Sequence, residues 1–143
     1  HIGPSGHAIR LKLIHNFIAF ANVLSWCEGF ALAAKEGLDL DQAIAIISAA
    51  GGKSGMLDLY GDATLNRDFT PWMSLANAAK DVRYYAEWIE KAGLPGFYAE
   101  AVSPCYRLAE LEGHAQEGCT SVIKFYERVT GVEARIGAAA NDG

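Results

Sequence analysis

Apolar positions along this chain recur at helical spacing, and glycines and prolines separate the segments that carry them. The first segment runs from Gly6 to Lys35 without a proline, and Gly37 follows it as a suitable helix C-cap. A helix of ~30 residues extends about 45 Å, which is longer than most globular domains require. We therefore expect a long N-terminal helix that connects or crosses two bodies.

Shorter helices are predicted after it. Asp39 or Asp41 is suited to cap the second helix, whose apolar face carries several isoleucines. The other predicted helices cover 57–65, 71–92 with Pro71 in the first turn, 97–111 with Pro104 at a kink or a boundary, and 120–130.

The resulting fold class is all-α with five or six helices, because no alternating strand pattern of useful length and no internal repeat is present. Residues 1–130 are expected to form one helical domain. Residues 131–143 are expected to form a flexible, frayed tail.

Composition narrows the class of partner. A chain of 143 residues with a formal charge of −5 has no basic footprint, so we expect neither nucleic acid nor an anionic membrane as a partner. The apolar stretch 17–34 contains Asn22, Ser25 and Glu28, too many polar residues for a membrane span. No signal peptide is visible, and the 3 cysteines form no CxxC, which favours reduced thiols and a cytoplasmic location. The histidines lack HExxH spacing, so no metal site is expected.

The segment SGHAIRLKLIHN carries the first candidate chemistry. Lys12 and Asn16 lie four residues apart and so project from one helical face, with His15 at its border. A partly desolvated lysine can exchange a proton with a substrate oxygen, while an amide holds the same substrate by hydrogen bonds. Spacing alone favours the plainer interpretation, a solvated polar stripe.

Lys80 and Asp81 form a second candidate pair. Neighbours in sequence point about 100° apart on a helix, so these two side chains do not face each other as an ion pair. Spacing alone again favours a solvated face. The tryptophans and tyrosines are most simply core or interface residues.

Several stretches together resemble the β-hydroxyacid dehydrogenases, the family of 3-hydroxyisobutyrate dehydrogenase and a distant relative of 6-phosphogluconate dehydrogenase. GPSGHAIRLKLIHN resembles the family's glycines, with Gly3 and Gly6, followed by its catalytic lysine and substrate-binding asparagine. CEGFALAAKEGLDLDQA, GGKSGML and DFTPWMSLANAAKD resemble later segments in the same order. The resemblance covers the chain from Gly3 to about Tyr126.

The resemblance implies a fold like the C-terminal domain of 6-phosphogluconate dehydrogenase and an NAD(P)-dependent oxidoreductase. It assigns catalysis to Lys12, substrate binding to Asn16 and Gly6, cofactor contact to Lys80, and support to Asp81 and His15. The substrate would be a small β-hydroxyacid that is interconverted with its semialdehyde or keto form. NAD or NADP would be bound mainly by an N-terminal Rossmann domain that is absent from this chain, and the protein would be a homodimer.

Three positions depart from the family pattern: Ala8 replaces a glycine, Met73 a phenylalanine and Cys119 an aspartate. The alternative interpretation is a stand-alone helical module that dimerises or binds a partner without catalysis. The two interpretations differ in the expected effect of Lys12→Ala, which would abolish turnover only in an enzyme.

Overall fold

The computed structural model describes residues 6–137. Its helical elements, in chain order, are α1 (His7–Lys35), α2 (Leu40–Ala49), α3 (Gly55–Leu65), α4 (Leu75–Lys91), α5 (Phe97–Ala109), a π-helical turn η1 (Glu110–His114), a 3₁₀ turn η2 (Cys119–Val122) and α6 (Ile123–Thr130). Within residues 6–137 there is no β-strand, only one isolated bridge between Ser74 and Gly118. The predicted all-α class with a long first helix is confirmed.

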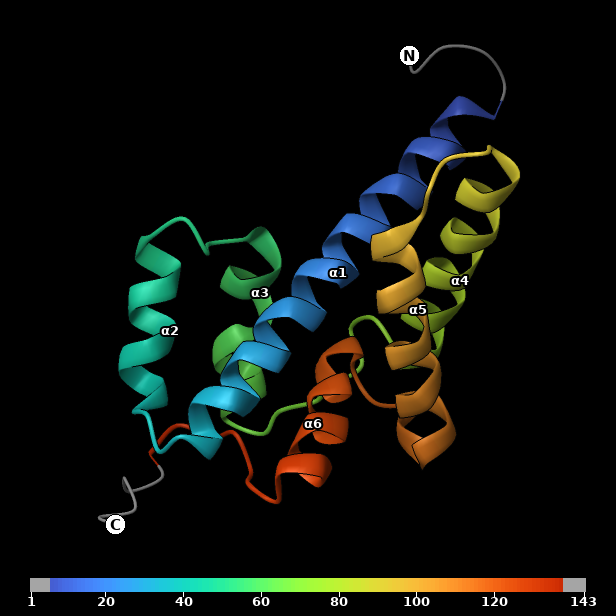
Figure 1. The fold of residues 1–143 in the computed structure, drawn as a ribbon. Helices are drawn as coiled ribbons and strands as arrows, with labels where there is room; N and C mark the ends of the chain where they lie inside the picture. The colour runs from blue at the N-terminus through green and yellow to red at the C-terminus, as the bar shows by residue number, and fades with distance from the viewer. Residues whose placement is uncertain (1–5, 138–143) are drawn as a thin grey trace.

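Helix α1 is the spine of the molecule (Figure 1). Helices α2 and α3 lie beside its C-terminal half, α4 and α5 lie beside its N-terminal half, and α6 also packs against it. Its length and composition would suit a membrane span, yet 56% of its most apolar window is buried in the protein. Burial among the other helices accounts for that composition.

Side-chain caps and left-handed residues set the helix ends. Gly6 (φ 92°) precedes α1 and Gly37 (φ 72°) follows it, as the sequence predicts. The choice between Asp39 and Asp41 is settled in favour of Asp39, whose carboxylate accepts hydrogen bonds from the Asp41 and Gln42 amides.

The predicted start of the fourth helix is wrong. Helix α4 begins at Leu75, and the Ser74 hydroxyl accepts a hydrogen bond from the Asn77 amide as the cap. Pro71 lies before the helix because the segment that contains it pairs with a distant one. The Gly118 amide donates to the Phe69 carbonyl at 2.8 Å, and the Leu75 amide donates to the Glu117 carbonyl at 2.8 Å.

Pro104 lies inside α5, which ends at Ala109.

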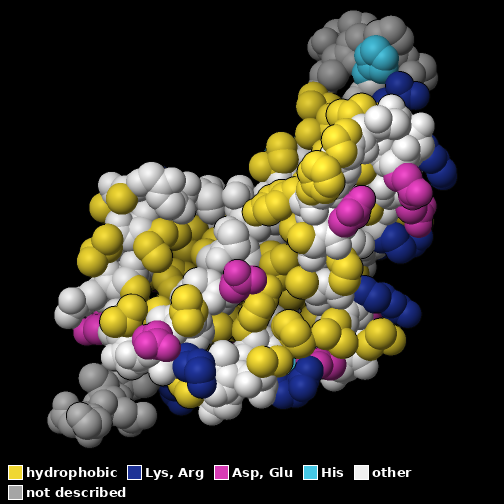
Figure 2. Space-filling model, in the orientation of Figure 1, with side chains coloured by type: hydrophobic (Ala, Val, Ile, Leu, Met, Phe, Trp, Pro, Cys, Tyr) yellow, Lys and Arg dark blue, Asp and Glu magenta, His cyan; other side chains and the backbone are white. Residues whose placement is uncertain are grey.

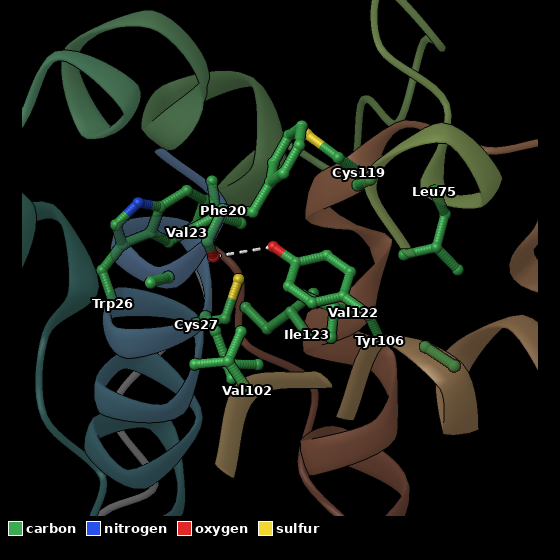
Figure 3. Packing of buried hydrophobic residues seen from close by; sticks show 14 of the residues in the cluster. Phe20, Val23, Trp26, Cys27, Leu75, Val102, Tyr106, Cys119, Val122 and Ile123 are labelled. Atoms are coloured by element: carbon green, nitrogen blue, oxygen red, sulfur yellow. Dashed lines mark hydrogen bonds between the residues drawn. The ribbon is translucent and has the colours of Figure 1, made fainter. Parts of the chain in front are cut away.

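The core fills the space between α1 and the other helices (Figure 3). Its largest fully buried side chain is that of Tyr106 on α5, whose hydroxyl donates to the Phe20 carbonyl of α1 at 2.8 Å. This bond satisfies the only polar atom of the tyrosine side chain and ties α5 to the spine.

The segment after α6 is packed more closely than the expected frayed tail. Ala134 is fully buried, and its amide donates to the Glu127 carboxylate at 2.9 Å. The Ile136 amide donates to the Leu65 carbonyl at 3.1 Å. The rest of the expected tail, 138–143, and Gly3 of the N-terminal motif lie outside the described residues.

Candidate active site

One hydrogen bond joins two of the candidate residues across the α1–α4 contact. The side-chain amide of Asn16 donates to a carboxylate oxygen of Asp81 at 2.7 Å, although the two residues are 65 positions apart in the chain. Asn16 is only 8% exposed, so its amide is held in a defined orientation. The structure therefore brings together Asn16 and Asp81, which the sequence places on separate helices.

Aromatic packing fixes the crossing at this point. Phe17, next to Asn16, stacks on Tyr85, one turn after Asp81, with ring centroids 4.0 Å apart and planes 7° apart. Tyr98 of α5 meets Phe17 edge to face at 6.2 Å. Such pairs restrain both distance and rotation of the helices, which holds the Asn16–Asp81 bond in register.

Lys12 and His15 border this pair. Lys12 lies one turn before Asn16 on α1 and is exposed, and its ammonium group has no hydrogen bond or ion pair within residues 6–137. The His15 ring nitrogen Nδ1 lies 3.2 Å from the side-chain oxygen of Asn16, to which it donates when it carries the proton. The exposed Lys12 amine and the fixed Asn16 amide therefore lie on one helical face.

Gly6 and Lys80 lie outside the hydrogen-bonded pair. Gly6 precedes the first turn of α1, six positions before Lys12, with a backbone conformation that strongly favours glycine. Lys80 is exposed, and within residues 6–137 its ammonium group has one hydrogen-bond partner, the Asn77 side-chain oxygen at 3.4 Å. As the helical spacing predicts, Lys80 and Asp81 do not form an ion pair. The exposed Lys80 ammonium group suits an anionic group that approaches α4 from solvent.

Comparison with known proteins identifies the family. The family described as "NAD-binding of NADP-dependent 3-hydroxyisobutyrate dehydrogenase" matches residues 6–126, which is most of the chain. The chain belongs to this family.

Curated relatives are longer than this chain. It is 28% identical to a mitochondrial 3-hydroxyisobutyrate dehydrogenase-like protein of Arabidopsis thaliana, over 94% of the chain and 40% of that protein. It is 26% identical to L-threonate dehydrogenase of Escherichia coli K12, over 87% of the chain and 41% of that enzyme. The chain thus spans about 40% of the length of the curated relatives it matches.

Solved structures share the fold. A 3-hydroxyisobutyrate dehydrogenase from Salmonella typhimurium superposes with a TM-score of 0.78 at 26% identity, over 81% of this chain and 41% of that one. The Mycobacterium tuberculosis 3-hydroxyisobutyrate dehydrogenase with L-serine gives a TM-score of 0.77 at 21% identity, over 87% of this chain and 45% of that one. The resemblance inferred from the sequence is confirmed.

Sequence reasoning missed a different group of residues. Trp72, expected to be a core or interface residue, is 81% exposed, and it lines a pocket with Tyr60, Asp68 and Cys119. The one local signal is the Asp-x-Thr pattern at Asp68, in which the Thr70 amide and hydroxyl both bind the carboxylate.

The Asn16–Asp81 bond makes a pH-dependent prediction. Asn16→Asp places two carboxylates at hydrogen-bonding distance, so one of them is stable only when protonated. The folded-state pKa of that carboxyl then exceeds its unfolded value, and the destabilisation is greatest above both values and shrinks as pH falls. We expect a loss of about 1–2 kcal/mol in unfolding free energy at pH 7.5 that largely disappears only below the unfolded pKa, by about pH 3.

Urea titrations of Asn16→Asp at both pH values provide the measurement, with Asn77→Asp as a matched control on the exposed face of α4. A loss of unfolding free energy that is the same at both pH values would show that the two carboxylates do not interact.

Proposed function

We propose that the full-length protein is an NAD(P)-dependent dehydrogenase that interconverts a β-hydroxyacid and its semialdehyde or keto form. The observation that carries this proposal is the Asn16–Asp81 hydrogen bond, which fixes an amide one turn from the free amine of Lys12. Membership of the family and dehydrogenase relatives support the reaction class.

The nicotinamide cofactor, when bound, accepts or supplies the hydride. In oxidation, Lys12 takes the proton of the substrate hydroxyl as the carbon loses its hydride, and in reduction Lys12 returns that proton to the carbonyl oxygen. The Asn16 amide orients the substrate with its remaining hydrogen-bonding capacity, while Asp81 and His15 hold that amide in place.

Two further residues complete the proposed cleft. Gly6 allows the substrate to approach the backbone at the start of α1, and the exposed Lys80 amine contacts the cofactor. A separate Rossmann domain in the full-length protein would supply most of the dinucleotide site and close the cleft. The 143-residue chain alone should therefore show no turnover.

The test is an absorbance assay at about 340 nm, the band of the reduced nicotinamide, with the full-length protein. Substrates would be 3-hydroxyisobutyrate, L-threonate and serine, each with NAD⁺ and with NADP⁺. We expect reduction of one cofactor with at least one β-hydroxyacid and none with the 143-residue chain. Absence of turnover in the full-length protein with every pair would remove this proposal in favour of the non-catalytic helical module.

We also propose that the protein is a homodimer. Hydrophobic side chains gather along α1 and over the first turn of α5 (Figure 2). Phe97 and Tyr98 are 77% and 59% exposed there, and Leu94 before them is 58% exposed. An apolar patch of this kind marks an interaction surface.

Light scattering should give twice the chain mass for the full-length protein, and Phe97→Asp should lower the measured mass to that of the monomer. A monomeric wild-type protein would exclude this assembly.

A further inference from the structure

The pocket that Trp72 lines lies between α3, the segment before α4 and η2. Its volume is about 250 Å³, and it is lined by Leu59, Tyr60 and Ala63 of α3, by Asp68, Thr70 and Trp72, and by 118–120. It shares no residue with the cluster of Lys12, Asn16 and Asp81, and the proposed dehydrogenase chemistry does not use it. A pocket of this size suits a small molecule rather than a polypeptide.

Backbone hydrogen bonds hold the pocket walls. The Gly118 amide donates to the Phe69 carbonyl and the Cys119 amide donates to the Met73 carbonyl, both at 2.8 Å. The approach is close enough that a Cβ at Gly118 would lie 2.9 Å from the Thr70 carbonyl oxygen. Two segments about 50 residues apart are thus clamped together, so the pocket is formed without a ligand.

The floor presents neutral polar groups. Thr120 is 3% exposed, and its hydroxyl has no hydrogen-bond partner within residues 6–137. Burial raises the pKa of the Cys119 thiol to about 12, and burial also raises the pKa of the Tyr60 phenol above its ordinary value. These groups therefore contribute hydrogen-bonding capacity but no charge to the pocket.

The mouth carries the negative charge. Asp68 accepts hydrogen bonds from the Thr70 hydroxyl at 2.6 Å and from the Thr70 amide at 2.9 Å, both through the same oxygen, and these bonds lower the pKa of its carboxyl. Its second oxygen has no partner within the described range. The exposed indole of Trp72 stands beside it in the pocket wall.

Two cations come near this region without neutralising Asp68. Arg67 and Lys124 lie over the Phe69 ring, at 4.9 Å and 4.4 Å from its centroid. Each already has carboxylate partners: Arg67 binds Glu127, and Lys124 binds Glu117 at 2.6 Å. The pocket therefore combines one free carboxylate oxygen with two aromatic side chains and an apolar wall.

We propose that this pocket binds a small organic cation, an ammonium or amidinium group carried on a short apolar body. The cationic group donates to the free oxygen of Asp68 and lies against the Trp72 indole, while the apolar body contacts Leu59 and Ala63. This site is independent of the proposed dehydrogenase reaction.

Benzamidinium is a suitable probe, because it is flat, cationic and small enough for the volume, and benzamide is its uncharged analogue. Isothermal titration calorimetry of benzamidinium into the full-length protein should show saturable binding. Affinity should fall at least about tenfold in Asp68→Asn and in Trp72→Ala, and benzamide should bind at least about tenfold more weakly. Asp62→Asn, an exposed carboxylate on α3 that does not line the pocket, should leave affinity unchanged.

Three results would each overturn the proposal: no saturation up to about 10 mM, benzamide affinity equal to that of benzamidinium, or unchanged affinity in Asp68→Asn. Trp72→Ala keeps the test valid if Asp68→Asn fails to fold, because the Trp72 side chain is largely exposed. Loss of turnover in Lys12→Ala does not bear on any of these results, so the two proposals fail separately.

Discussion

Replacing Glu127 with alanine should lower the free energy of unfolding by about 3 kcal/mol, a large share of the 5–15 kcal/mol typical of a domain. The Glu127 carboxylate, 9% exposed, accepts hydrogen bonds from both terminal nitrogens of Arg67, at 2.5 and 3.0 Å. It also accepts the Ala134 amide at 2.9 Å. The substitution leaves the Arg67 guanidinium, 20% exposed, without its main partner and removes the acceptor of a buried amide.

Urea denaturation measures this loss. Glu133→Ala is the matched control, because Glu133 contacts the same arginine at 3.6 Å but is 49% exposed, and it should change stability by less than about 0.5 kcal/mol. The amide of Ala134 should also exchange its hydrogen faster in Glu127→Ala. A loss below about 1 kcal/mol would show that the pair contributes little beyond an ordinary surface ion pair.

Local patterns in the sequence predict the helices well where a helix end depends on its own residues. Gly6 and Gly37 bracket α1 because each adopts a left-handed conformation. The start of α4 could not be predicted in this way. Backbone hydrogen bonds from 117–119 hold the segment around Pro71 outside the helix, and this pairing joins positions about 50 residues apart.

In the candidate site, too, local spacing predicts some features, whereas others depend on contacts between distant segments. Helical spacing places Lys12 beside Asn16 and separates Lys80 from Asp81, and the structure agrees with both. The bond between Asn16 and Asp81 depends on how α1 and α4 cross, and the Phe17–Tyr85 stack is one of the contacts that hold this crossing. The pocket at Trp72 was missed because its lining comes from three separate segments with no shared motif.

Replacing Lys12 with alanine in the full-length protein should lower kcat by about 10²–10⁴-fold, the usual contribution of general acid–base catalysis. The fold should remain intact, because Lys12 is exposed and has no hydrogen bond or ion pair within residues 6–137. Arg10→Ala is the matched control, since Arg10 is an exposed cation two positions earlier on the same helix, and its turnover should stay near that of the wild type.

A purely structural role for Lys12 would alter stability, whereas a proton-transfer role alters the pH profile. We expect the dependence of kcat/KM on pH to lose the limb that reports the catalytic base in Lys12→Ala, and added alkylamines to restore part of the rate. Steady-state kinetics from about pH 6 to 10 measure both effects. Near-normal turnover in Lys12→Ala would remove Lys12 from the chemistry, and it would leave the Asn16–Asp81 bond as a structural contact between α1 and α4.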